Sequence, residues 1–310
     1  ENEHTFLERN STPLPSQMAI SRYAHTAMVH KDNMYVIGGV DHVENVLGSM
    51  EIYDFHEKKW TTSPHELLTA RSDHSAVVHG NKLYAMGGID SADNRLNSVE
   101  VFDLSGIDGG GWKLLSSAMP TRRIGFALSV YNDLLVLVGG ADDTYTLLGS
   151  GDVYNVATGQ WTTLPTDLCT PRLNRCAVVH NHKMYLAGGT NAVYEPLSSI
   201  EMYDFFTGEW TTLPIKLTIP RRLHAGALIG NCFYLVGGEG DAAKRSITRV
   251  ALPLMTALLW SPSRNHRYPH RFRMVVRMVM MCGARLNNPH IPDDLLFVVM
   301  SMLNSTAFLR

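Results

Sequence analysis

Arginine recurs along this 310-residue chain at nearly regular steps of 46 to 52 residues. The copies are Arg22, Arg71, Arg123, Arg172, Arg221 and Arg267. A ring of guanidinium groups would suit bidentate binding of a carboxylate or phosphate. Recurrence in every unit is more typical of a structural role, in which each arginine bonds carbonyl oxygens or the aspartates Asp54, Asp103 and Asp204. Arg122 and Arg175 are extra to the repeat, so they are the better ligand candidates, and a small-molecule site would centre on Arg123 and Arg175.

Acidic residues gather in five segments whose sequences differ from one another while their flanks keep phase. The segments are 40–48, 89–97, 141–149, 190–198 and 239–245, and they hold nine acidic residues against three basic ones. Shared residues of a repeat protein mostly hold the scaffold, and variable loops on one face carry recognition. The candidate partner-binding residues in these loops are therefore Asp90, Asp93, Arg95, Asp142, Asp143, Tyr145 and Tyr194. An acidic rim of this kind favours a basic peptide or protein and repels polyanions; the alternative is that these are solvated loop charges without a partner.

Fourteen histidines invite a metal hypothesis. His30, His79 and His180 share one position of the repeat, so their copies belong to separate units rather than to one coordination sphere. His25, His74, His224 and His270 share another position, three residues after the repeated arginine, where a hydrogen-bonded structural histidine is the favoured interpretation. The chain has no glycine-rich phosphate loop, nucleophile elbow or HExxH motif. We expect no metal and no cofactor.

The elements that must position these residues are short strands. Each unit has four short apolar or alternating segments separated by Asn, Asp, Gly and Pro, for instance HSAVVHG, KLYAMGG, SVEVFD and WKLLS. A glycine pair ends the second segment, where a missing Cβ permits positive φ and close backbone approach. A tryptophan follows in five units, at Trp60, Trp112, Trp161, Trp210 and Trp260, and we expect it to pack between neighbouring sheets.

The order Arg-x-x-His, apolar run, Tyr-x-x-Gly-Gly, variable loop, Tyr-Asp and Trp resembles the kelch repeat from residue 12 to about residue 300. The resemblance implies an all-β propeller in which each repeat is one blade of four antiparallel strands. Six repeat starts, near 22, 71, 123, 172, 221 and 267, then predict six blades, although the sixth has Gly283-Ala284 in place of Gly-Gly. We expect residues 1–11 to be flexible and residues 12–310 to form a single propeller, closed by an N-terminal strand that pairs with the last blade.

Two functions follow from the resemblance. The first is a protein-interaction module that binds a peptide or protein on the loop face, such as the substrate-recognition part of a ubiquitin-ligase adaptor or a scaffold. The alternative is a carbohydrate-active enzyme, either a sugar mutarotase or epimerase or an oxidase. No residue can be matched to a copper site of the oxidase kind, and acid–base work needs two groups at a fixed separation that sequence does not show. The sequence favours binding over catalysis.

The composition of the chain restricts the kinds of partner and the cellular compartment that we expect. The net charge of −2 implies no affinity for nucleic acid or membranes, and no charge-free apolar run is long enough to span a bilayer. The four cysteines fall at different repeat positions and form no Cys-x-x-Cys pair, which is typical of reduced thiols. We therefore expect a cytoplasmic, monomeric propeller.

Overall fold

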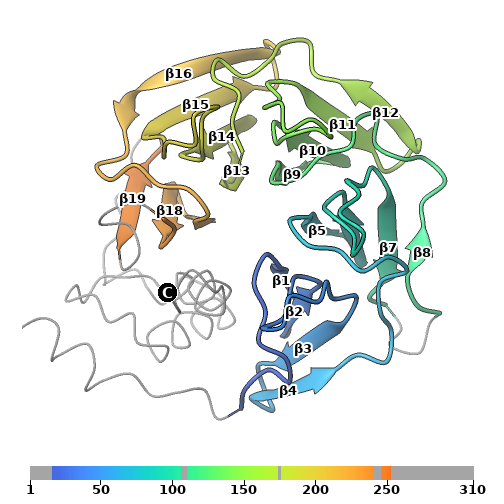
Figure 1. The fold of residues 1–310 in the computed structure, drawn as a ribbon. Helices are drawn as coiled ribbons and strands as arrows, with labels where there is room; N and C mark the ends of the chain where they lie inside the picture. The colour runs from blue at the N-terminus through green and yellow to red at the C-terminus, as the bar shows by residue number, and fades with distance from the viewer. Residues whose placement is uncertain (1–15, 106–109, 174–175, 240–245, 253–310) are drawn as a thin grey trace, which may run out of the picture.

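The computed structural model describes residues 16–105, 110–173, 176–239 and 246–252, and the fold and the candidate site are built from these residues. Nineteen strands form five antiparallel sheets that stand like blades around a central axis (Figure 1). In every sheet the strands follow chain order, and the first strand of each blade lies nearest the axis. Inner strands of successive blades are neighbours, so the chain builds the ring blade by blade.

The strands are as follows. Blade 1 contains β1 (Thr26–His30), β2 (Asn33–Ile37), β3 (Met50–Asp54) and β4 (Lys59–Thr62). Blade 2 contains β5 (Ser75–His79), β6 (Lys82–Met86), β7 (Val99–Asp103) and β8 (Lys113–Leu114). Blade 3 contains β9 (Ala127–Tyr131), β10 (Leu134–Val138), β11 (Gly151–Asn155) and β12 (Gln160–Thr163). Blade 4 contains β13 (Cys176–His180), β14 (Lys183–Ala187), β15 (Ser199–Asp204) and β16 (Glu209–Lys216). Blade 5 contains β17 (Ala225–Ile229), β18 (Cys232–Val236) and β19 (Ile247–Ala251).

The all-β propeller is as predicted, but the prediction of six blades is wrong. The described residues form five blades, four with four strands and a fifth with three. Residues 253–310, which contain the predicted sixth blade, and residues 12–15, which contain the predicted closing strand, lie outside the described residues. The spacing of Arg267 and Gly283 is a weak criterion for a blade, because the described blades need glycine at both positions of the pair.

Steric contacts show why two glycines are needed. Gly38 and Gly39 both have positive φ, and a Cβ on either would lie 2.5 Å from a backbone carbonyl oxygen. The N–H of Gly39 donates to the carbonyl oxygen of Arg71 in the next blade at 2.9 Å. The second glycines of blades 2, 3 and 4 donate to the next blade in the same way, so the pair joins neighbouring blades. A unit with Gly283-Ala284 lacks one of these two glycines.

The repeated arginines of the five described blades are structural. Arg71 is fully buried and donates to the carbonyl oxygens of Gly87 and Ser98, to the Ser98 hydroxyl and to the Glu100 carboxylate. Glu100 in turn accepts the N–H groups of Leu68 and Thr69, which anchors the incoming linker to the blade. Burial lowers the pKa of Arg71, and the facing carboxylate opposes that shift. The buried arginine therefore stabilises the interior of its blade. Its bonds to carbonyl oxygens are those that we expected if the repeated arginines have a structural role.

Asp54 and Asp204, which the sequence offered as partners of the repeated arginines, instead accept hydrogen bonds within turns. Asp54 accepts the N–H groups of His56 and Glu57 in the turn after β3, and Asp204 accepts that of Phe206 after β15. The carboxylate that meets the arginine lies instead inside the third strand of blades 1 to 4, at Glu51, Glu100, Asp152 and Glu201. In blade 5 the hydroxyl of Thr248 takes its place opposite Arg221.

The hydrophobic core lies between blades rather than within one sheet. One cluster joins Ile37 and Met50 of blade 1 to Leu83 and Trp112 of blade 2, and similar clusters join each later pair of blades up to the fifth. Each described tryptophan packs against an aromatic ring of the neighbouring third strand, with ring centroids 5.0 to 5.4 Å apart. Trp112, Trp161 and Trp210 also pack in the clusters between blades, as expected, whereas Trp60 packs in a cluster formed by blade 1 and Met18.

Candidate functional site

The loops between the second and third strands of each blade and the linkers between blades open on the same face of the ring, which we call the loop face. Backbone bonds show the proximity: the N–H groups of Leu67 and Arg71, in the linker to blade 2, donate to the carbonyl oxygens of Gly48 and Leu47 in the loop of blade 1. The loops after β1, β3 and their copies open on the opposite face, because adjacent strands are antiparallel. His30 and His79 lie there and bond side chains of the following blade.

The loops of blades 1 to 4 share one backbone conformation although their sequences differ. The side-chain oxygen of Asp90 accepts the N–H groups two and four residues further on, at Ala92 and Asn94. Asp41, Asp142 and Asn191 do the same in their loops. The third residue after the capping side chain has φ between 61° and 65° in every case. These four residues, which we call the tip residues, are Glu44, Asp93, Tyr145 and Tyr194.

Identical backbones carry different chemistry at the tips. Acidic tip residues belong to blades 1 and 2, whereas tyrosine occupies the tips of blades 3 and 4. Both tyrosines are exposed, Tyr145 by 54% and Tyr194 by 61% of their surface. Left-handed φ costs a non-glycine residue roughly 1–2 kcal/mol, and strain of this kind clusters at functional positions.

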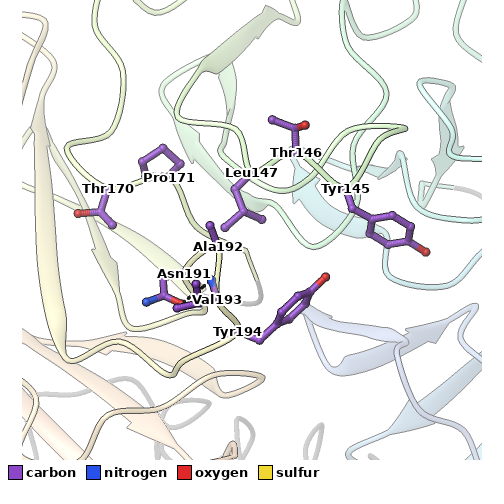
Figure 2. A pocket seen from close by; sticks show the side chains of 9 residues that line it. All are labelled: Tyr145, Thr146, Leu147, Thr170, Pro171, Asn191, Ala192, Val193 and Tyr194. Atoms are coloured by element: carbon purple, nitrogen blue, oxygen red, sulfur yellow. Dashed lines mark hydrogen bonds between the residues drawn. The ribbon is translucent and has the colours of Figure 1, made fainter.

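An open groove of about 530 Å³ lies between the loops of blades 3 and 4. Figure 2 shows both tyrosine rings at one end of it, pointing to the same side, toward the centre of the ring. The remaining lining comes from the two loops and from the linker between the blades: Thr146, Leu147, Thr170, Pro171, Asn191, Ala192 and Val193. Val193 is 69% exposed, so the rim is apolar as well as the floor.

Arg95 holds one tyrosine wall. Its guanidinium carbon lies 3.8 Å from the centroid of the Tyr145 ring, a cation–π contact. Arg95 is only 8% exposed, and its Nε and Nη2 atoms are buried without an acceptor among the described residues. Blade 3 has Leu147 at the same repeat position, and this smaller side chain leaves the groove open toward blade 4.

Arg222 holds the loop of the other tyrosine wall. Its Nη1 donates to the carbonyl oxygen of Tyr194 at 3.0 Å, and its Nε and Nη2 both meet the Glu239 carboxylate at 3.0 Å. Glu239 of blade 5 thus holds the guanidinium group in place, and the guanidinium group in turn stabilises the loop of blade 4. Both tyrosine walls are therefore supported by an arginine of a neighbouring blade.

The predicted acidic residues divide into two kinds. Asp90 and Asp142 cap their loops; partial desolvation raises the pKa of each, but hydrogen bonds outweigh it and hold the pKa below the ordinary value. The positive charge of Arg95 adds to the lowering at Asp142. Asp93 and Asp143 are exposed. These four carboxylates belong to two loops, of blades 2 and 3, that are in contact through Arg95 and Tyr145, and we call them the acidic patch.

The described arginine candidates of the linker to blade 3 differ in their surroundings. Arg122 is exposed in the linker to blade 3, whereas Arg123 is fully buried and donates to Gly139, Ser150 and Asp152 of its own blade. Arg175 and the loop segment 240–245 lie outside the described residues. What the structure brings together is Arg95, Tyr145, Asp142 and, across the groove, Tyr194.

Sequence reasoning missed the groove residues Leu147, Pro171 and Val193, which look like ordinary apolar residues. A signal for the tip residues is present in the sequence. An Asp or Asn recurs as the second residue of the first four variable loops and predicts an Asx turn. Counting three residues on from Asp41, Asp90, Asp142 and Asn191 gives Glu44, Asp93, Tyr145 and Tyr194 without any structure.

Blades of antiparallel strands, the buried arginine and the glycine pair define a kelch-type β-propeller. The sequence profile of the KLHDC2/KLHL20/DRC7 Kelch-repeats domain matches residues 24–238, most of the chain. The chain therefore belongs to the kelch-repeat family, whose propellers generally bind proteins.

Comparison of structures agrees on the fold. A solved structure titled "Structure of YjhT" superposes with a TM-score of 0.62 at 15% sequence identity, covering 74% of this chain and 84% of the other. No curated protein sequence matches the chain.

Two kinds of feature are absent from the described residues. They contain no group of three or more His, Cys, Asp or Glu side chains placed to hold a metal ion. None of their elements is a helix of the length and hydrophobicity that crossing a membrane requires.

Proposed function

We propose that this propeller is a protein-interaction module that binds a peptide or protein segment on its loop face, at the groove between blades 3 and 4. The observation that carries the proposal is the pair of exposed tip tyrosines, Tyr145 and Tyr194, standing at an apolar groove on the face where the loops gather. Tyrosine is enriched at protein interfaces because its ring has an apolar body and a polar end.

The acidic patch supports a basic partner. Besides Arg123, which is buried and paired with Asp152, the loops of blades 2 and 3 and the linker between them contain two arginines, of which Arg95 is stacked and buried and Arg122 is exposed. Net negative charge beside the groove attracts lysine and arginine side chains and accelerates their approach. A role as substrate-recognition part of a ligase adaptor is the narrower form of this proposal and requires a second partner.

A carbohydrate-active role stays a prediction. The lining of the groove includes no carboxylate to serve as general acid or base. Burial raises the pKa of Asp73, but this residue does not line the groove.

The proposal is tested by capture from a cell lysate with three forms of the chain, read by mass spectrometry. The variant Tyr145→Ser/Tyr194→Ser removes both tip rings, and Phe206→Ser is the matched control, because Phe206 is 77% exposed in the turn after β15 on the opposite face. We expect partners that the wild type and the Phe206 variant retain and the tyrosine variant loses. Partners retained equally by all three forms would place binding elsewhere.

A further inference from the structure

The groove and the acidic patch are adjacent, and together they restrict what a partner must contain. Tyr145 lies where the groove and the acidic patch adjoin, because its ring stands at the end of the groove and Asp142 and Asp143 precede it in the same loop. Asp93, the tip residue of the preceding loop, has the same backbone conformation as Tyr145. The loop face therefore changes from acidic to aromatic within two neighbouring blades.

The geometry points to a linear peptide of another protein as the occupant, with one apolar or aromatic side chain in the groove and a lysine or arginine a few residues away at Asp143 and Asp93. This inference rests on the proposed function and names its ligand class. The groove supplies apolar contact from Leu147, Pro171 and Val193 but contains no charged side chain to pair with a charged anchor. The charge requirement is met outside the groove by carboxylates that are exposed.

The walls of the groove are held in place before a partner binds, which favours a peptide as the occupant. The Tyr145 ring is stacked on Arg95, and the Tyr194 main chain is bonded by Arg222. Walls that are held before binding reduce the conformational entropy lost on association. Each loop is also fixed internally by its capping Asp142 or Asn191.

A second copy of this chain is disfavoured as the occupant by charge. Apart from the buried arginines of the repeat, the described loops and linkers of its loop face carry basic residues at Arg95, Arg122 and Arg222 against the acidic residues Asp41, Glu44, Glu66, Asp73, Asp90, Asp93, Asp142, Asp143, Asp167, Glu195 and Glu239. Two such faces repel one another at moderate ionic strength.

The test is selection of binders from a random dodecapeptide phage library against the full chain, followed by affinity measurements on synthetic copies of the enriched peptides. We expect enriched peptides to share an aromatic or large aliphatic residue with Lys or Arg within four positions. Tyr145→Ser and Tyr194→Ser should each weaken binding at least tenfold, whereas Asp93→Asn/Asp143→Asn should weaken it about three- to tenfold and reduce its salt dependence. Phe206→Ser should leave the affinity unchanged.

The outcomes separate this inference from the proposed function. Enriched peptides that are acidic overturn the ligand class while leaving a peptide-binding groove, whereas peptides that bind the tyrosine variants as well as the wild type place binding elsewhere and overturn both. Failure to enrich any peptide overturns both. Sedimentation of the free chain covers the remaining occupant, since self-association that Tyr145→Ser abolishes would show that the groove holds a second copy.

Discussion

Two buried arginines of this propeller are in opposite situations, and the contrast explains what each contributes. Arg71 is fully bonded to carbonyl oxygens and to Glu100, whereas Arg95 stacks on Tyr145 with two buried nitrogens that have no acceptor among the described residues. A buried donor without an acceptor costs roughly 1–3 kcal/mol. Arg95 therefore contributes little or nothing to the stability of the fold. Its contact with the ring of Tyr145 is instead the feature that a binding function would preserve.

The residue-scale prediction is that Arg95→Leu leaves the fold as stable as before or stabilises it by about 1 kcal/mol, because leucine removes the unpaired donors. Leu147 already occupies this position in blade 3. Arg71→Leu is the contrasting variant: it strands the Glu100 carboxylate in the interior and should cost about 3–5 kcal/mol. Urea unfolding followed by tryptophan fluorescence measures both, and equal losses would contradict the distinction.

At the scale of the blade, most elements follow from sequence because their constraints are local. Strand segments and glycine pairs repeat in phase, and strands end where glycine must take positive φ, so blades 1 to 4 could be predicted residue by residue. The partner of Arg71 was missed, since Glu100 is one of several acids nearby and only strand register places it opposite the guanidinium. The groove was missed for a similar reason: Leu147, Pro171 and Val193 come from three separate segments that meet only when two blades are set side by side.

The element-scale prediction compares two glycines that both have positive φ but differ in how closely other atoms surround them. At Gly88 a Cβ would lie 2.5 Å from the carbonyl oxygen of Ser72, whereas at Gly80, in the turn between β5 and β6, nothing lies within 4 Å. Gly80→Ala should therefore cost only the strain of positive φ, about 1 kcal/mol. Gly88→Ala adds a clash with backbone and weakens the bond to Arg123 in blade 3, so we expect a loss on the order of 3 kcal/mol or more.

Chemical denaturation of the two glycine variants under identical conditions measures the difference. Similar losses for both would mean that the glycine pair is present for its φ alone and not for the close approach of the next blade.

At the scale of the whole ring, two histidines lie at the contacts between blades. His74 packs against Gly38 of blade 1, and His224 packs against Gly188 of blade 4. Burial, with a smaller contribution from the adjacent arginine, lowers the pKa of His224 to about 3 and that of His74 well below its ordinary value. Phe126 occupies the equivalent place in blade 3 against Gly87, so an uncharged aromatic ring fits at this contact as well.

The whole-molecule prediction is acid sensitivity that originates at these contacts. Between about pH 6.5 and pH 3 the unfolded chain binds a proton at His224 that the folded chain excludes, so stability is complete above pH 6.5 and falls as the pH is lowered. His224 lowers the free energy of unfolding by roughly 1.4 kcal/mol per pH unit over this interval. His224→Phe, which copies the ring that Phe126 supplies in blade 3, should keep its stability at pH 7.5 within about 1.5 kcal/mol and lose less stability between pH 6.5 and pH 5 than the wild type. Thermal unfolding at a series of pH values measures both slopes, and an unchanged slope in the variant would assign the acid sensitivity to groups other than this contact between blades 4 and 5.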